Sequence, residues 1–130
     1  MALLCAYETR VSGVLEAGDL AHSVVGLQVI FEGAAAWLFR AVQLEPGHAP
    51  LEPVRRILER QERAHQDFGH RALTMLGAYR SHTSLAGAGQ EYAERVADLL
   101  AACEPLLGRF SVALDDYDPC ATVEDMWLRS

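Results

Sequence analysis

Apolar residues recur through most of the chain at spacings of three and four, the period of helices that bury one face. Glycine and proline divide this pattern into a short block over 4–15 and three long blocks over about 20–44, 53–79 and 90–117. No segment shows the strict alternation of apolar and polar residues that is typical of a half-buried β-strand. The pattern therefore predicts an all-α fold, in which the blocks are the helices of a bundle.

Residues that favour helix ends stand at the boundaries of these blocks. Asp19 is a good N-cap for the second block, and residues 45–50, EPGHAP, interrupt the chain before the third. The small residues of 81–89, SHTSLAGAG, predict a flexible connection. Pro105 should kink the last block or split it at Glu104, because proline removes a helical hydrogen bond.

The second block is apolar nearly all round, yet it contains one carboxylate. The sixteen residues from Val24 to Phe39 include a single acidic residue, Glu32. A carboxylate in such surroundings loses hydration, which costs several kcal/mol unless the group is paired, protonated or bound to a cation. Gly33 and the alanines at 34–36 keep the neighbouring surface small, so another helix or an ion can come close.

The third block has separate charged and apolar faces, and two polar residues fall on the apolar one. Glu59 and His70 are expected to point outward with the arginines, whereas Glu62 and His65 lie within the apolar stripe. Residues three apart on a helix are neighbours, so this Glu and His can bind one metal ion together. With Glu32 from the preceding helix they form a candidate half-site of three ligands. The stripe predicted to be buried consists of Val54, Ile57, Leu58, Phe68, Ala72, Leu73 and Leu76.

The run from Glu32 through Gly33 to Trp37, followed thirty residues later by Glu62-x-x-His65 and Phe68-Gly69, resembles the second half of the ferritin-like di-iron superfamily. In oxygenases, desaturases and ribonucleotide reductase small subunits of that superfamily, a Glu on one helix precedes a Glu-x-x-His motif on the next. The resemblance covers roughly residues 20–76. It implies a ferritin-like bundle with a carboxylate-bridged di-iron or di-manganese site that activates O₂ or peroxide to oxidise a small-molecule substrate or iron itself. Glu32 or Glu62 would bridge the ions, and His65 would be a terminal ligand.

The chain departs from the superfamily pattern in two respects. Gln61 stands where an acid is usual, and no second Glu and Glu-x-x-His are found, so only three of six ligands are present. A two-fold symmetric homodimer would supply the complete set, and such dimers are the commonest oligomers. A half-bundle completed by oligomerisation is therefore expected. The alternatives are a partner chain that carries the other half-site, or a vestigial site.

Length and charge narrow the function further. The chain of 130 residues is long enough for one helical domain, 1–130, and too short for two. Its 18 acidic and 11 basic residues give a net charge of -7, which argues against a nucleic-acid partner. Polar residues within the apolar span 20–39 favour a core helix over a membrane helix. Cys5, Cys103 and Cys120 are odd in number and have no CxxC spacing, which predicts free thiols in the cytoplasm.

Two rival functions remain open at this point. The first is a non-catalytic helical dimerisation module with a vestigial site, in which Glu32 and His65 bond to each other. The second is a HEPN-type ribonuclease, suggested by the spacing of Arg60 and His65. The acidic charge of the chain argues against this second function, as does the expected outward direction of Arg60.

Overall fold

The computed structural model describes residues 1–76, 82–118 and 121, and these residues form helices and no strand. The all-α prediction is therefore confirmed for this part of the chain. The elements are α1 (Ala2–Glu16), α2 (Leu20–Val24), η1 (Val25–Phe31), α3 (Glu32–Ala41), η2 (Pro46–Leu51), α4 (Glu52–Leu76), α5 (His82–Ala102), α6 (Glu104–Leu107), η4 (Gly108–Phe110) and η5 (Leu114–Asp116). Of these, η1 is π-helical, and η2, η4 and η5 are 3₁₀-helical.

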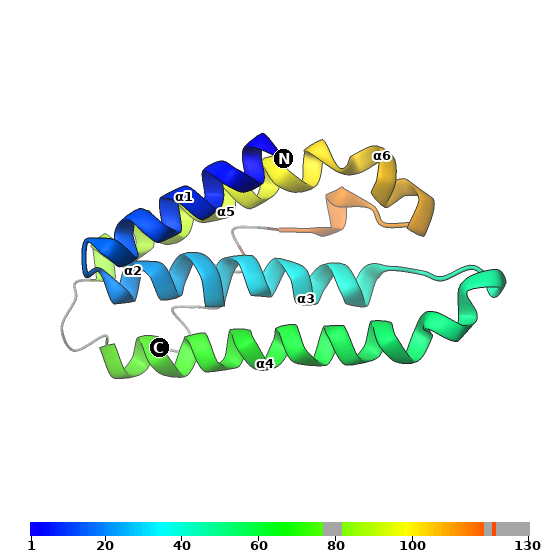
Figure 1. Cartoon of the computed structure of the whole chain (residues 1–130), viewed down its shortest axis with the longest axis horizontal. Coiled ribbons are helices and arrows are strands. Elements are labelled where there is room, and N and C mark those ends of the chain that lie inside the picture. The colour runs from blue at the N-terminus through cyan, green and yellow to red at the C-terminus, as the bar shows by residue number, and fades with distance from the viewer. Residues whose placement is uncertain (77–81, 119–120, 122–130) are drawn as a thin grey trace.

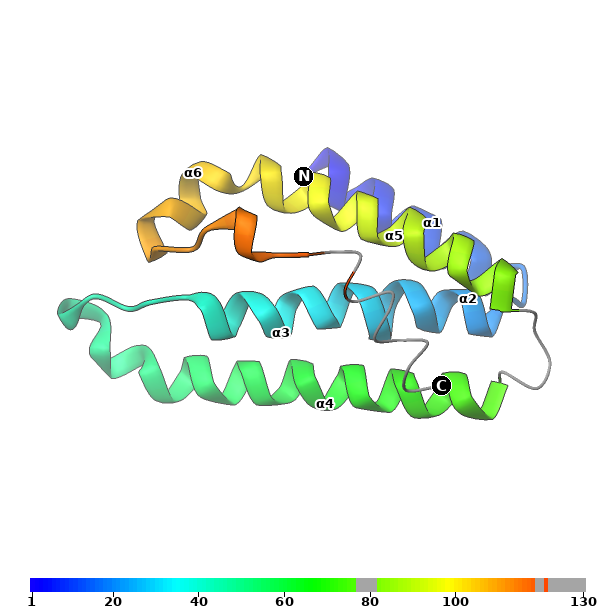
Figure 2. The same ribbon diagram turned by 180° about the vertical axis from the view of Figure 1, so that it is seen from behind.

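The three elements α2, η1 and α3 follow one another without a break and form a central helix, Leu20–Ala41 (Figure 1). Helix α4 lies along one side of this central helix, and α1 and α5 pack on the opposite side (Figure 2). Val25, Val29, Ile30 and Tyr92 are fully buried where these layers meet. The core is therefore built around η1.

The layer of α1 and α5 diverges from the central helix toward the end that carries α6 (Figure 1). The chain beyond α6 folds back along α3 into this widening space. Gln43 N donates a hydrogen bond to Phe110 O at 3.0 Å, and the rings of Trp37 and Tyr117 lie 5.0 Å apart. These contacts join the part of the chain after α6 to α3 and to the residues that directly follow α3.

Most of the predicted helix boundaries agree with the structure to within a few residues. Asp19 caps the central helix as expected, since its side chain accepts a hydrogen bond from His22 N at 3.0 Å. The second block ends at Ala41 rather than 44, and the third begins at Glu52. Residues 77–79, predicted to end the third block, lie outside the described residues.

The prediction of a flexible connection over 81–89 is wrong from residue 82 onward, because α5 already begins at His82. Leu85 and Ala88 are buried in the core, and this packing outweighs the weak helix propensity of the glycines around them. Helix α5 ends at Ala102 and α6 begins at Glu104, so the predicted split before Pro105 is confirmed. The single block predicted over 90–117 therefore falls into several shorter elements.

By length and mean hydropathy, 1.4 over its most apolar window, the central helix could cross a membrane. It lies instead between two layers of helices that cover it from opposite sides (Figures 1 and 2). That surrounding is the one expected for the core helix of a globular bundle.

Candidate metal centre

The structure brings Glu32, Glu62 and His65 together between the central helix and α4. Each offers a ligand atom, and these atoms all lie within 4.8 Å of one another. His65 Nδ1 lies 3.7 Å from Glu32 Oε2 and 3.4 Å from Glu62 Oε2. Among the described residues, no other group of three His, Cys, Asp or Glu side chains converges in this way.

A π-helical segment directly precedes Glu32 and affects the direction of its side chain. The backbone N–H of Glu32 donates to Leu27 O, five residues earlier, rather than to the carbonyl four residues earlier. A π-turn contains one more residue than an α-turn, so η1 rotates everything that follows it about the helix axis. Tyr7 Oη donates a hydrogen bond to Gly26 O within this segment. The direction in which the Glu32 side chain leaves the central helix, toward α4, therefore depends on η1.

Two glycines near the site allow the central helix and α4 to approach closely. A Cβ atom at Gly33 would lie 2.3 Å from Gln66 Nε2, and one at Gly69 would lie 2.6 Å from Gln28 Cβ. Gln66 Nε2 also donates a hydrogen bond to Val29 O at 3.3 Å. The short separation that these residues permit brings the carboxylate of the central helix within reach of those on α4.

An arginine holds the two helices together near the start of α4. Arg55 Nη1 donates a hydrogen bond to Phe39 O near the end of α3, and the same guanidinium pairs with Glu52 and Glu59. The prediction that Glu59 points outward is wrong, since its side chain is only 17% exposed and lies against Arg55. An ionic network therefore lies one turn before the candidate metal site on the same helix.

The site contains two largely buried carboxylates and one open imidazole. Glu32 and Glu62 are each 18% exposed, whereas His65 is 54% exposed. Burial raises the pKa of Glu32 to about 7, with further contributions from the hydrogen bond and the charge of Glu62, while His65 acts in the opposite direction. Glu62 Oε2 is buried and accepts no hydrogen bond. Both carboxylates are therefore in an environment that a cation would stabilise.

The apolar face of α4 is rotated relative to the prediction. His70, expected outside, is 4% exposed, so this prediction is wrong, and Gly69 and Leu73 are buried beside it. Val54, Ile57 and Phe68, expected inside, are exposed. The physical reason is that α4 packs along the central helix on one side only, so one helix cannot cover the whole of its wide apolar stripe. His65 lies at the edge of the covered part.

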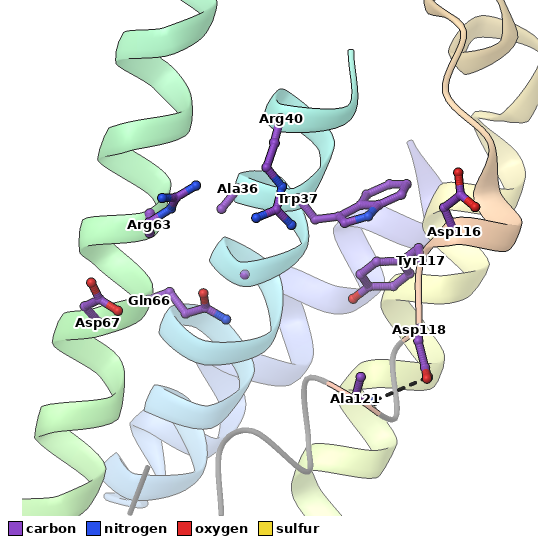
Figure 3. A pocket seen from close by; sticks show the side chains of 11 residues that line it. Ala36, Trp37, Arg40, Arg63, Gln66, Asp67, Asp116, Tyr117, Asp118 and Ala121 are labelled. Carbon is purple, nitrogen blue, oxygen red and sulfur yellow. Dashed lines mark hydrogen bonds between the residues drawn. The ribbon is translucent and has the colours of Figure 1, made fainter. Parts of the chain in front are cut away.

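A polar cavity of about 610 Å³ borders the same pair of helices. Gly33 and Gln66 contribute to its wall, and Figure 3 shows side chains of α3, of α4, and of η5 with the segment that follows it around the cavity. Asp118 Oδ1 accepts a hydrogen bond from Ala121 N at 3.3 Å in this segment. The other labelled residues of the lining are Ala36, Trp37, Arg40, Arg63, Asp67, Asp116 and Tyr117. Sequence reasoning did not find this cavity, because its residues come from three separate segments.

Cys5 and Cys103 are free, as predicted for these two cysteines, and both are exposed, whereas Cys120 lies outside the described residues. No family model matches the chain, and no curated protein or solved structure matches it either.

Proposed function

We propose that Glu32, Glu62 and His65 bind a divalent iron or manganese ion as one half of a ferritin-like, carboxylate-bridged dinuclear centre. The observation that carries this proposal is the convergence of three ligand atoms, from two adjacent helices, within 4.8 Å. Two carboxylates and an imidazole suit Fe(II) and Mn(II), whereas a soft metal would favour thiolates. Cys5 and Cys103 are not among the converging residues.

The separations of the ligand atoms fit one small ion. Oxygen and nitrogen ligands bind such ions at about 2.0–2.2 Å, so neighbouring ligand atoms on one ion are about 3 Å apart. The 3.4 Å and 3.7 Å separations from His65 Nδ1 are slightly longer than that. A small rotation of the exposed His65 side chain would shorten both of these separations toward that value.

The charge state of the site also favours a cation. With its pKa near 7, Glu32 keeps a proton over much of the neutral range, and a metal ion would displace that proton. The buried Glu62 Oε2, which accepts no hydrogen bond, would gain a partner at the same time. Metal binding would therefore remove two unfavourable features of the site.

The residues would have distinct roles. Glu32 or Glu62, whose carboxylates converge between the two helices, would bridge two ions, and His65 would be a terminal ligand. A complete centre of this type supplies oxidation by O₂ or peroxide, of a substrate or of iron itself. The adjoining cavity of about 610 Å³ is large enough for a small-molecule substrate. The remaining ligands would come from a second copy of the chain or from a partner chain.

Metal content tests this proposal directly. The protein is loaded with Fe(II) under anaerobic conditions and desalted, and iron is measured beside the variants Glu62→Gln and Glu59→Gln. Glu59 is a matched control because it lies on the same helix and is buried to the same extent, but pairs with arginines. We expect about one iron per chain in the wild type and in Glu59→Gln, and most of it lost in Glu62→Gln.

Two results would contradict the proposal. Iron that stays bound equally in Glu62→Gln would place the site elsewhere. Absence of iron and manganese from the wild type would instead support a non-catalytic helical dimerisation module, in which Glu32 and His65 interact only with each other.

A further inference from the structure

Tyr7 of α1 is buried against the π-helical segment η1. Its side chain is 3% exposed, and its hydroxyl donates a hydrogen bond to Gly26 O, the carbonyl of the second residue of η1. The centroid of its ring also lies 5.3 Å from that of Phe31, the last residue of η1. Tyr7 therefore contacts η1 near both of its ends.

The two positions that Tyr7 contacts come onto one side of the helix only in the π register. Gly26 and Phe31 are five residues apart, and residues five apart in an α-helix are separated by about 140° around the axis. In a π-helix the backbone hydrogen bonds themselves join residues five apart, so such residues lie nearly above one another. One tyrosine side chain can therefore keep both contacts in the π register, whereas the α register would turn Phe31 away from it.

The Tyr7 hydroxyl is placed where it favours the π register. π-helical segments are rare, so contacts from outside the helix are needed to favour one over the α register. A side chain that inserts into the backbone hydrogen bonds of a helix is one recognised cause of a local departure from α geometry. The ring of Tyr92 lies 5.3 Å from that of Tyr7 and packs so closely on Gly26 that a Cβ atom there would lie 2.6 Å from Tyr92 Cζ. The two tyrosines therefore fix the start of η1 from the side of α1 and α5.

The register of η1 reaches the candidate metal site through one further hydrogen bond. The backbone N–H of Glu32 donates to Leu27 O, and Leu27 directly follows Gly26 in the chain. In the α register the same N–H would donate to Gln28 O, and the Glu32 side chain would leave the helix in a different direction. In the observed register Glu32 Oε2 lies 3.7 Å from His65 Nδ1. A change of register would therefore turn Glu32 away from the other two candidate ligands.

We propose that Tyr7 is a positioning residue for the candidate metal centre. Its hydroxyl holds η1 in the π register, and this register directs Glu32 at Glu62 and His65. Tyr7 itself supplies no ligand, since it lies on α1, on the side of the central helix opposite to α4 (Figure 1). Its role in metal binding rests on the proposed function above, whereas its control of the register of η1 does not.

NMR of the metal-free protein measures the register of η1 directly. A scalar coupling across a hydrogen bond identifies the carbonyl carbon to which each backbone N–H is bonded. We expect Glu32 N to couple to the carbonyl carbon of Leu27 in the wild type, and to that of Gln28 in Tyr7→Phe. Phenylalanine keeps the ring and removes only the hydroxyl, and trimethylamine N-oxide in the buffer favours the folded state of all proteins. A wild type that couples to Gln28, or a variant that keeps the coupling to Leu27, would overturn the proposal.

Titration with Mn(II) tests the consequence for the metal site. We expect the dissociation constant to rise about tenfold or more in Tyr7→Phe, because part of the binding energy must then restore the π register. Val14→Ala is the matched control, since Val14 is buried on the same helix and its carbonyl accepts a hydrogen bond from Asp19 N at the turn before α2. This control should lose stability but bind Mn(II) within about twofold of the wild type. Equal affinity in Tyr7→Phe and the wild type, or an equal loss in both variants, would show that Tyr7 does not position Glu32.

The two measurements separate this inference from the proposed function. A coupling that moves to Gln28 in Tyr7→Phe, with no Mn(II) bound by any of the proteins, supports the role of Tyr7 in directing Glu32 and contradicts the metal site. Mn(II) bound equally by the wild type and Tyr7→Phe, with the coupling to Leu27 kept in both, overturns the inference and leaves the metal site intact. A coupling that moves together with weaker Mn(II) binding supports both.

Discussion

Replacement of Glu32 by glutamine in the metal-free protein separates a metal site from a carboxylate that serves the fold. Glutamine keeps the shape of the side chain and its hydrogen-bonding atoms but removes the ionisable group. The pKa of Glu32 rises from 4.5 to about 7 in the folded protein, chiefly because the group is buried. The folded protein therefore binds a proton more tightly than the unfolded chain does. Between these two values, unfolding becomes easier as the pH rises.

The size of this effect follows from the change in pKa. Each tenfold change in proton affinity corresponds to about 1.4 kcal/mol, so a rise from 4.5 to about 7 corresponds to about 3 kcal/mol when the group is fully ionised. Water reaches the site from the side of the exposed His65, and its screening reduces this to about 1–2 kcal/mol. The loss of stability that ionised Glu32 causes is absent below about pH 4.5 and complete above about pH 7. Glu32→Gln should therefore be more stable than the wild type by about 1–2 kcal/mol at pH 8, with a smaller difference at pH 5.

Urea unfolding followed by circular dichroism, at several pH values in the presence of a chelator, measures this difference. Glu91→Gln is a control with the opposite sign, because Arg10 hydrogen-bonds to Glu91 and lowers its pKa. The stability that Glu91 contributes is present above the pKa of 4.5 in the unfolded chain and is lost as the pH falls below that value. Glu91→Gln should thus be less stable than the wild type at neutral pH. If Glu32→Gln is also less stable than the wild type at pH 8 without metal, the carboxylate is stabilised by its neighbours and the reasoning is refuted.

Addition of metal should reverse the order of stability of Glu32→Gln and the wild type. A ligand that binds only the folded state stabilises it according to its concentration and affinity, and the wild type should bind more tightly than the variant. With Mn(II) in excess, the wild type should therefore become the more stable of the two. A carboxylate that only packs in the core would give the same order of stability with and without metal.

Two further predictions concern the packing that positions the site. Gly69→Ala should lower the unfolding free energy by about 2–3 kcal/mol, because the added Cβ would lie 2.6 Å from Gln28 Cβ. Gly13→Ala is the control, because a Cβ at Gly13 meets nothing within 4 Å, and it should raise the unfolding free energy by about 0.5–1 kcal/mol. If urea unfolding gives the same change for both variants, the close approach of the two helices at Gly69 is contradicted. Tyr7→Phe should cost about 1–3 kcal/mol in the same assay, because the buried Gly26 carbonyl loses its hydrogen-bond donor. A change of less than about 0.5 kcal/mol would show that Gly26 finds another partner.

The arrangement of the helices was largely predictable because it depends on patterns that are local in the chain. Helical periodicity, the Asp19 cap and Pro105 identify where the main helices begin and end to within a few residues. The start of α5 at His82 was not predictable in this way. That start depends on Leu85 and Ala88 finding buried positions against distant residues, and a run of small residues contains no signal for it.

The grouping of the three candidate ligands was predictable because each is a polar residue in an apolar pattern, at a spacing that places two of them on one helix face. The geometry that brings them together was not. The π-helical register of η1 arises when the backbone hydrogen bonds shift by one residue, and no residue type reports that shift. The ionic network of Arg55 with Glu59 was missed for a related reason. Its buried position follows from the rotation of α4, which the periodicity of α4 alone does not determine.

The errors on α4 share one cause, and that cause has consequences for the site. Periodicity identifies which residues of a helix are apolar, but it does not show how many neighbouring helices cover them. On α4 the apolar stripe is wider than the contact with the central helix, so Ile57 and Phe68 are exposed and His70 lies inside. His65 lies at the boundary between the covered and the exposed parts, which leaves one ligand of the candidate site open to solvent while two carboxylates are buried behind it. The width of the contact with the central helix therefore decides both which apolar residues of α4 stay exposed and which of the three candidate ligands water can reach.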